Sequence, residues 1–157
     1  MRALTETAIF DTAFGLPLHS LVVHAAVVLV PLAAIGAVVM AFSPRFSRRF
    51  GALVVVVAIV GFGSSFIAKE SGEALARRVG LPAEHAQLGD LMPVFALLLA
   101  GGLTVFWLFD RGIPGNRSRP WWLKVGAVLL VIVSVLAVYW TIRVGHSGAE
   151  AVWLKIM

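Results

Sequence analysis

Four long runs of apolar residues dominate the chain, and the polar residues are concentrated between them. The runs cover residues 18–42, 50–68, 91–109 and 121–142. A transmembrane helix needs roughly 20 mostly apolar residues to cross about 30 Å of hydrocarbon, and each run is about that long. The runs do not alternate in polarity as barrel strands do, and in lipid a helix satisfies its own backbone hydrogen bonds. The pattern predicts an all-α integral membrane four-helix bundle.

The segments outside the runs divide the chain into two parts. Residues 1–17 are mixed in polarity, and their apolar side chains are compatible with a short helix lying on the membrane surface. Residues 18–153 form the predicted four-helix domain. The second connection, residues 69–90, mixes charged and apolar positions, so we expect the second helix to continue beyond the lipid and to end at Gly80.

The two halves of the chain share a faint internal similarity. The first and third helices each contain a histidine followed by a proline. The second and fourth helices end in similar text, ESGEA at 70–74 and HSGAEA at 146–151. Two helical hairpins related by an axis along the membrane normal would give this pattern, and so would chance matches in a chain rich in Ala and Gly.

Composition narrows the class of protein. Of the 157 residues, 60% are hydrophobic and 13% are charged. An average soluble domain is about half apolar and about a quarter charged, so soluble enzymes and nucleic-acid-binding modules are excluded as first interpretations. The chain has no cysteine, which excludes disulfides, iron–sulfur clusters and thiolate zinc sites.

The basic residues predict the orientation in the membrane. The formal charge is +5, and three arginines lie in each of the short connections at 43–50 and 110–120. The positive-inside rule places both connections in the cytoplasm, so both termini are predicted to be extracytoplasmic. A composition rich in Ala, Val, Gly and Arg suggests a bacterium, and therefore a bacterial plasma membrane.

All four histidines fall at the predicted outer ends of the helices. His19 and His24 open the first helix. His85 opens the third helix, and His146 closes the fourth. A spacing of five residues rotates a side chain by about 140° on a helix, so His19 and His24 are not expected to hold the same ion. Because ionisable residues at membrane depth indicate function, we expect a polar cluster of His24, His85 and His146, with His19 peripheral.

Three uses of this cluster stay open. Ligation of a b-type haem by two of the histidines is favoured, because four-helix bundles hold cofactors between facing helices. A metal site of His24, His85, His146 and Asp90 would instead suit Zn²⁺ or Cu²⁺. A structural network of histidines bonded to neighbouring helices would bind nothing.

The corresponding functions are a redox or cofactor module and a non-catalytic accessory subunit of a larger membrane complex. The expected partners are the lipid bilayer and either other membrane or redox subunits or a second copy of the chain, with no nucleic acid. No nucleophile, base and orienting group occur at a recognisable catalytic spacing, so the sequence does not predict an enzyme.

The chain resembles a bacterial family on residues that include these histidines. The stretch GLPLHSLVVHAAVVL at 15–29 resembles the opening signature of the domain-of-unknown-function family 2231, which pairs two histidines after Gly and Pro. The family's third helix opens with a histidine, as AEHA does at 83–86. Its last helix ends in a Gly-His-x-Gly motif, matched at 145–148, with an aromatic residue near Trp153.

The resemblance covers about residues 15–153. Ser20 stands where the family usually has Pro, and Ala25 and Ala26 stand where it often has Phe-Pro. The resemblance implies a four-span integral membrane protein without an established activity. Some relatives are joined to Rieske-type iron–sulfur domains, which favours a redox role.

Overall fold

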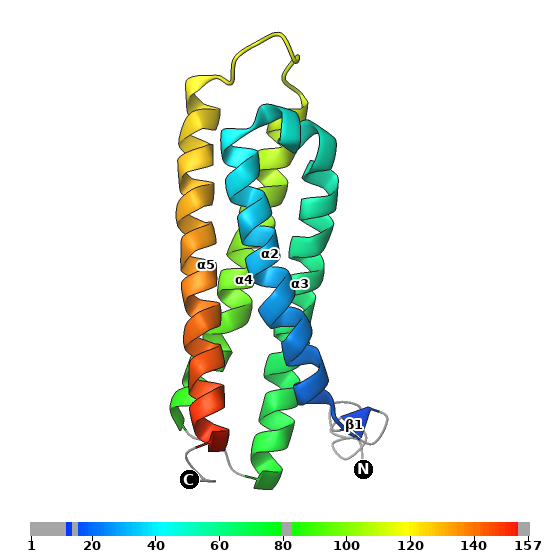
Figure 1. Ribbon diagram of the computed structural model, residues 1–157, viewed down its shortest axis with the longest axis vertical. Coiled ribbons are helices and arrows are strands. Elements are labelled where there is room, and N and C mark those ends of the chain that lie inside the picture. Colours follow the sequence, from blue (N-terminus) through cyan, green and yellow to red (C-terminus); the bar gives the residue numbers. More distant parts are fainter. Residues whose placement is uncertain (1–11, 14–15, 80–82, 154–157) are drawn as a thin grey trace.

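The computed structural model describes residues 12–13, 16–79 and 83–153, and in them the chain folds into four long helices. These are α2 (Leu18–Phe42), α3 (Pro44–Val79), α4 (Ala83–Arg111) and α5 (Trp121–Trp153). The helices run alternately up and down in one bundle (Figure 1). Each helix packs against its two neighbours in the order α2, α3, α4, α5, while α2 and α4 lie across the diagonal and barely touch.

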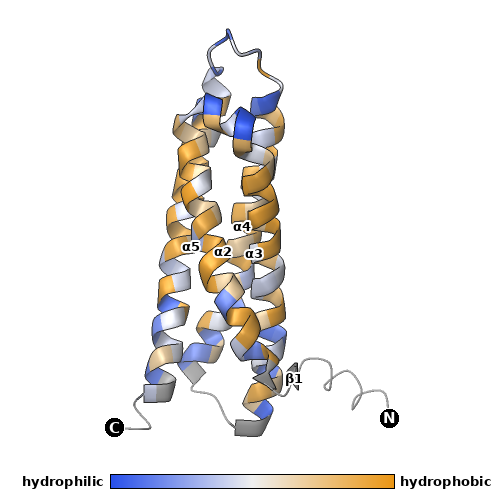
Figure 2. Cartoon of the chain, turned by 45° about the vertical axis from the view of Figure 1, so that its right-hand side comes forward, coloured by the Kyte–Doolittle hydropathy of each residue, from blue (hydrophilic) through white to orange (hydrophobic). Residues whose placement is uncertain are grey.

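The predicted all-α four-helix fold is confirmed. All four helices are long and apolar enough to cross a membrane. Figure 2 shows a hydrophobic middle along the bundle and hydrophilic residues toward both ends. This distribution is typical of a protein whose solvent is the hydrocarbon of a bilayer, because large apolar side chains cover the outside of the bundle as well as its core.

The first connection is shorter than predicted. Residues 43–50 were expected to join two helices, but Ser43 alone separates α2 from α3. The Phe46 backbone N–H lies 3.3 Å from Ser43 Oγ, which accepts its hydrogen bond as an N-cap. Pro44 takes the first helical position, where its missing N–H costs nothing. At its other end α3 continues to Val79, as the sequence predicts.

Only part of the N-terminal segment can be compared with the prediction. Residues 1–11, 14 and 15 lie outside the described residues. The described part is an antiparallel pair of short strands, β1 (Thr12–Ala13) and β2 (Leu16–Pro17), and not a helix. The residue before a proline favours extended backbone, which explains why Leu16 is in a strand.

The two hairpins, α2–α3 and α4–α5, correspond in their buried positions. Buried residues of α2 and α4 recur at the same spacing after His19 and His85: Ala26, Val30, Ala33, Ala34, Ala37 and Met40 in α2, and Met92, Ala96, Leu99, Ala100, Leu103 and Phe106 in α4. Buried residues of α3 and α5 match in the same way: Val54, Ala58, Ser65 and Ser71 in α3, and Leu130, Ser134, Thr141 and Ser147 in α5. The correspondence supports the repeated-hairpin interpretation.

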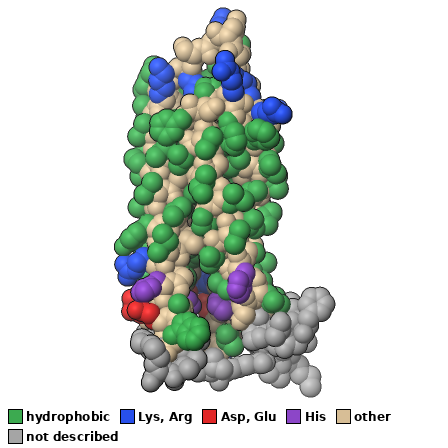
Figure 3. Space-filling model, in the orientation of Figure 1, with side chains coloured by type: hydrophobic (Ala, Val, Ile, Leu, Met, Phe, Trp, Pro, Cys, Tyr) green, Lys and Arg blue, Asp and Glu red, His purple; other side chains and the backbone are tan. Residues whose placement is uncertain are grey.

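The alternation of the helices gives the bundle two chemically different ends. The histidine end holds His19, His24, His85 and His146. The arginine end holds Arg45, Arg48, Arg49, Arg111, Arg117 and Arg119. In Figure 3 the histidines lie at one end, most visible basic side chains lie at the other, and a hydrophobic belt separates them.

Candidate functional site

The structure brings His19 and His85 together at the histidine end. Their ring centroids are 6.4 Å apart, and the ring planes meet at 83°. His19 belongs to α2 and His85 to α4, so the pair reaches across the diagonal of the bundle. Both side chains are partly buried.

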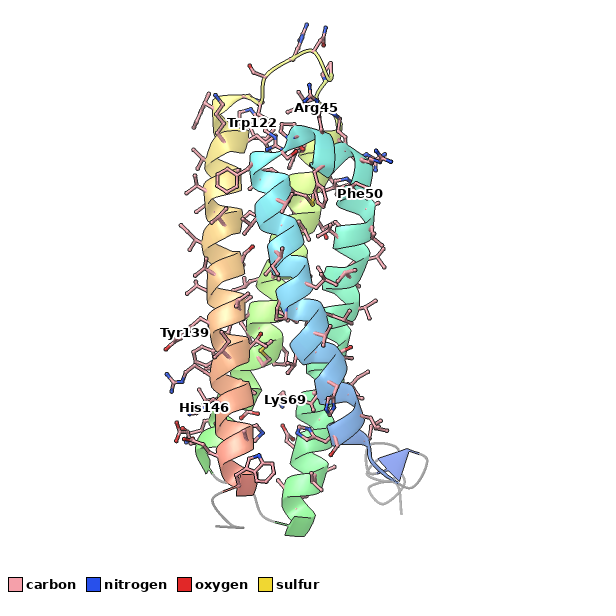
Figure 4. All side chains as sticks on the ribbon, in the orientation of Figure 1. Arg45, Phe50, Lys69, Trp122, Tyr139 and His146 are labelled. Carbon is pink, nitrogen blue, oxygen red and sulfur yellow. The ribbon has the colours of Figure 1, made fainter. Side chains whose placement is uncertain are left out.

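His24 and His146 lie elsewhere, so the expected cluster of His24, His85 and His146 does not form. His24 is exposed, and its Nδ1 bonds to the carbonyl of Ser20 on its own helix. The side chain of His146 is 72% exposed and bonds to Glu150 on its own helix (Figure 4). His19, expected to be peripheral, is in the helical phase of the buried residues of α2, whereas His24 points away from them.

The hydrogen bond of His19 identifies the tautomer of its neutral ring. Its Nδ1 lies 2.9 Å from the carbonyl oxygen of Ala68 on α3. A carbonyl oxygen only accepts hydrogen bonds, so Nδ1 carries the proton and donates it. In the neutral ring Nε2 then keeps its lone pair and is available to a ligand.

His85 is held in the same state through a serine. Its Nδ1 lies 3.0 Å from the hydroxyl oxygen of Ser147 on α5, and that hydroxyl lies 3.0 Å from the carbonyl oxygen of Val144. The Ser147 hydroxyl donates to the carbonyl and therefore accepts from Nδ1–H of His85. Both imidazoles are thus oriented through Nδ1, as metal-ligating histidines almost always are, and in the neutral ring both leave the lone pair of Nε2 available.

Two glycines let the imidazole rings lie against the neighbouring helices. A Cβ at Gly72 would lie 3.1 Å from Cε1 and Nδ1 of His19, and a Cβ at Gly148 would lie 3.0 Å from Cε1 of His85. These distances are shorter than ordinary van der Waals contacts, so an added methyl group would displace the rings. Each glycine follows a buried serine.

Each hairpin therefore contributes one imidazole in an equivalent setting. His19 packs on Gly72, and His85 packs on Gly148. One helical turn before each glycine, a backbone carbonyl group anchors the ring. The carbonyl of Ala68 accepts directly from His19, and the carbonyl of Val144 holds His85 through the Ser147 hydroxyl. The two similar segments at 70–74 and 146–151 contain Gly72 and Gly148. The internal similarity of the sequence was therefore the signal that could have identified these glycines.

A cavity of about 100 Å³ lies beside the histidine pair. Most of its wall is small and apolar. Its charged lining residues are Lys69 and Glu73 of α3 and Asp90 of α4. The ammonium group of Lys69 pairs with Glu73 and lies 3.9 Å from Oδ1 of Asp90, which links the two helices beside the cavity.

The residues expected to hold a metal without haem are not assembled. Asp90 is exposed and faces Lys69, while His24 and His146 point away from His85. Among the residues that the structure describes, no group of three or more His, Cys, Asp or Glu side chains is placed to hold a metal ion. The described donor set is therefore two imidazoles.

The arginine end is closed by a buried ion pair that the sequence reasoning did not anticipate. Nε and Nη2 of Arg119 donate to the two carboxylate oxygens of Asp110, both at 2.7 Å. The same guanidinium group donates to the carbonyl oxygens of Met40, at 2.8 Å, and Ala41 near the end of α2. The two side chains are only 8% and 1% exposed, so this contact joins the α4–α5 connection to α2 inside the bundle.

Comparison with known proteins gives a family and no closer relative. No curated protein and no solved structure matches the chain. A family model described as "Predicted membrane protein (DUF2231)" matches residues 15–155, which include all four helices of the bundle. The chain belongs to the DUF2231 family of predicted membrane proteins.

Proposed function

We propose that this protein is a membrane-embedded cofactor module in which His19 and His85 would hold a b-type haem. The observation that carries the proposal is the imidazole pair itself. Each ring donates through Nδ1, and Nε2 of each has no hydrogen-bond partner among the described residues. Neither Nε2 is among the buried side-chain atoms without a partner, so both are open to water or to a ligand.

The separation of the rings would allow both to bind one ion. Metal–nitrogen bonds are about 2.0 Å long, so two imidazoles that bind one ion would have ring centroids up to roughly 6 Å apart. The observed separation is 6.4 Å. A porphyrin supplies the other ligands of its iron, so two histidines are enough. A protein-only zinc site needs more side chains than the described residues bring together.

The volume of the cavity favours a second candidate, a single metal ion. A porphyrin is larger than the cavity of about 100 Å³, so haem binding requires the partly exposed side chains of Lys69 and Glu73 to move outward. A zinc or copper ion fits the volume of the cavity as it stands. Its ligands would be His19 and His85 with a carboxylate of Glu73 or Asp90 that leaves Lys69.

The proposed role follows from the position of the site. The arginine end is placed in the cytoplasm by the positive-inside rule, so the histidine end and both termini lie outside it, in a bacterial plasma membrane. Haem supplies reversible one-electron transfer when bound. The chain's own contribution is to fix the two rings through Ala68 and Ser147 and to present them near the outer membrane surface, within reach of a redox partner.

The test is an absorption spectrum and a metal analysis on the same purified sample from haem-replete cells. We expect a Soret band that shifts on reduction with dithionite, and its loss in His19→Ala and in His85→Ala. His24→Ala and His146→Ala are the matched controls and should keep the band. Bound zinc or copper without a Soret band would select the second candidate. A colourless, metal-free protein would overturn both.

A further inference from the structure

We propose that the arginine end carries a binding site for the phosphate group of an anionic phospholipid. An open pocket of about 370 Å³ lies there between the start of α3 and the α4–α5 connection. Its lining includes Arg45 and Arg48 from α3 and Arg117 from the connection. The inference does not depend on the histidine pair.

The three guanidinium groups lack carboxylate partners. In the described parts of the chain no Asp or Glu oxygen lies within 4 Å of Arg45, Arg48 or Arg117. Asp110 is the acid of this end, and Arg119 already occupies both of its oxygens. Like charges converging on one pocket repel each other, and a bound anion relieves that repulsion.

The chemistry of the lining suits a phosphate. Arginine presents its N–H groups in a planar fork that matches two phosphate oxygens at once. Ser43 and Pro44, at the start of α3, also line the pocket, and the positive end of the helix dipole adds to the potential there. The arginines would bind the phosphate, and the positive potential at the start of α3 would strengthen that binding.

The apolar part of the lining favours a lipid over a free anion. Phe42 lines the same pocket and is 77% exposed, so it continues the apolar outer surface of the bundle up to the arginines. Trp121 and Trp122 start α5 at the same end, and both side chains are exposed, as is typical of a membrane interface. Trp122 is labelled in Figure 4. A phospholipid can place its phosphate on the arginines and an acyl chain along Phe42, whereas a free phosphate would make no use of Phe42. Basic pockets between transmembrane helices bind lipid headgroups in this way.

The experiment measures binding of phosphatidylglycerol and phosphatidylcholine to the purified full-length protein in a neutral detergent. The pocket variant is Arg48→Gln with Arg117→Gln. The control variant is Arg49→Gln with Arg111→Gln, which removes the same charge at the same end from side chains that stack on Phe50 and Trp107. We expect the pocket variant to lose roughly tenfold or more in affinity for phosphatidylglycerol and the control variant to lose far less.

Several outcomes would overturn the assignment. Equal losses of phosphatidylglycerol affinity in both double variants would mean that the lipid is attracted by the overall surface charge and not by a defined site. Binding of inorganic phosphate with the same dependence on Arg48 and Arg117, and with no gain from a lipid, would assign the pocket to a soluble anion. If the glutamine variant does not fold, Arg48→Lys with Arg117→Lys keeps the charge and loses the planar fork. It should bind phosphatidylglycerol more weakly than the parent, and unchanged binding would contradict the proposal.

Discussion

The two ends of the bundle differ in how their paired side chains use their hydrogen-bonding atoms: the Asp110–Arg119 pair is buried, and the His19 and His85 rings are partly buried. At the arginine end, Arg119 donates to both oxygens of Asp110 and to two carbonyl groups of α2, so the pair is almost completely satisfied. At the histidine end, His19 and His85 each use Nδ1 and leave Nε2 facing no described partner.

This difference separates a structural contact from a candidate binding site. A satisfied polar cluster holds elements in place, and breaking it leaves a buried charge without a partner. Polar groups that are oriented but only half used keep a donor or an acceptor for a ligand. The two ends of the same four helices therefore differ in how completely their polar groups are paired.

The largest stability loss should come from the arginine end. Asp110→Asn leaves the guanidinium of Arg119 buried without its counter-charge, and we expect a loss of about 3–5 kcal/mol in the free energy of unfolding. Unfolding in a denaturing detergent measures it. Arg111→Gln, a neighbouring arginine that stacks on Trp107 at the surface, is the control and should cost far less. A loss below about 1 kcal/mol would contradict the structural role of the pair.

The next largest effect should come from the glycines under the imidazole rings. Gly72→Ala and Gly148→Ala place a methyl group against His19 and His85, and overpacking of this kind costs about 1–3 kcal/mol. Because the two settings are equivalent, the two variants should behave alike and should both weaken cofactor binding.

Gly145→Ala is the matched control for these variants. A Cβ at this position of α5 meets nothing within 4 Å, so the higher helix propensity of alanine should leave stability equal or slightly improved. If Gly148→Ala and Gly145→Ala have the same stability and the same cofactor content, the close contact with His85 has no consequence.

The fold was predictable because lipid imposes a simple rule on the sequence. A segment that crosses hydrocarbon must be long, apolar and helical, and the four runs fulfil this without ambiguity. The one-residue connection between α2 and α3 was harder to predict, because the arginines of residues 43–50 are typical both of a connection and of the first turns of a helix.

The end of the bundle that holds the histidines was predictable, but the pairing was not. In a soluble helix the apolar stripe marks the buried face, whereas here both faces are apolar and hydropathy does not distinguish them. Small residues carry that information instead, because they allow close helix packing. His19 is in phase with Ala26, Ala33 and Ala37, which are buried, and His24 is not. The pairing of Asp110 with Arg119 is a contact between separate elements that no local pattern encodes.

A smaller stability change should follow from removing either paired imidazole in the cofactor-free protein. His19→Ala loses one hydrogen bond, about 1 kcal/mol. The Ser71 hydroxyl lies 3.2 Å from the carbonyl of Ala68, but its shorter hydrogen bond, 2.7 Å, is to the carbonyl of Ile67. The same substitution should abolish cofactor binding. The measurements are the unfolding free energy and the cofactor content of one preparation. A stability loss as large as that of Asp110→Asn would mean that the histidine pair is structural, and the comparison between the ends would fail.

The smallest effect should come from the two exposed histidines, and it decides between the grouping expected from sequence and the one in the structure. His24→Ala and His146→Ala remove only bonds within one helix at exposed positions, and we expect changes within about 0.5 kcal/mol and no loss of cofactor. Loss of cofactor in His24→Ala but not in His19→Ala would mean that α2 presents its other face to the site. In that case the bundle would have to rotate α2 when it binds the cofactor, and the free Nε2 of His19 would no longer mark the site.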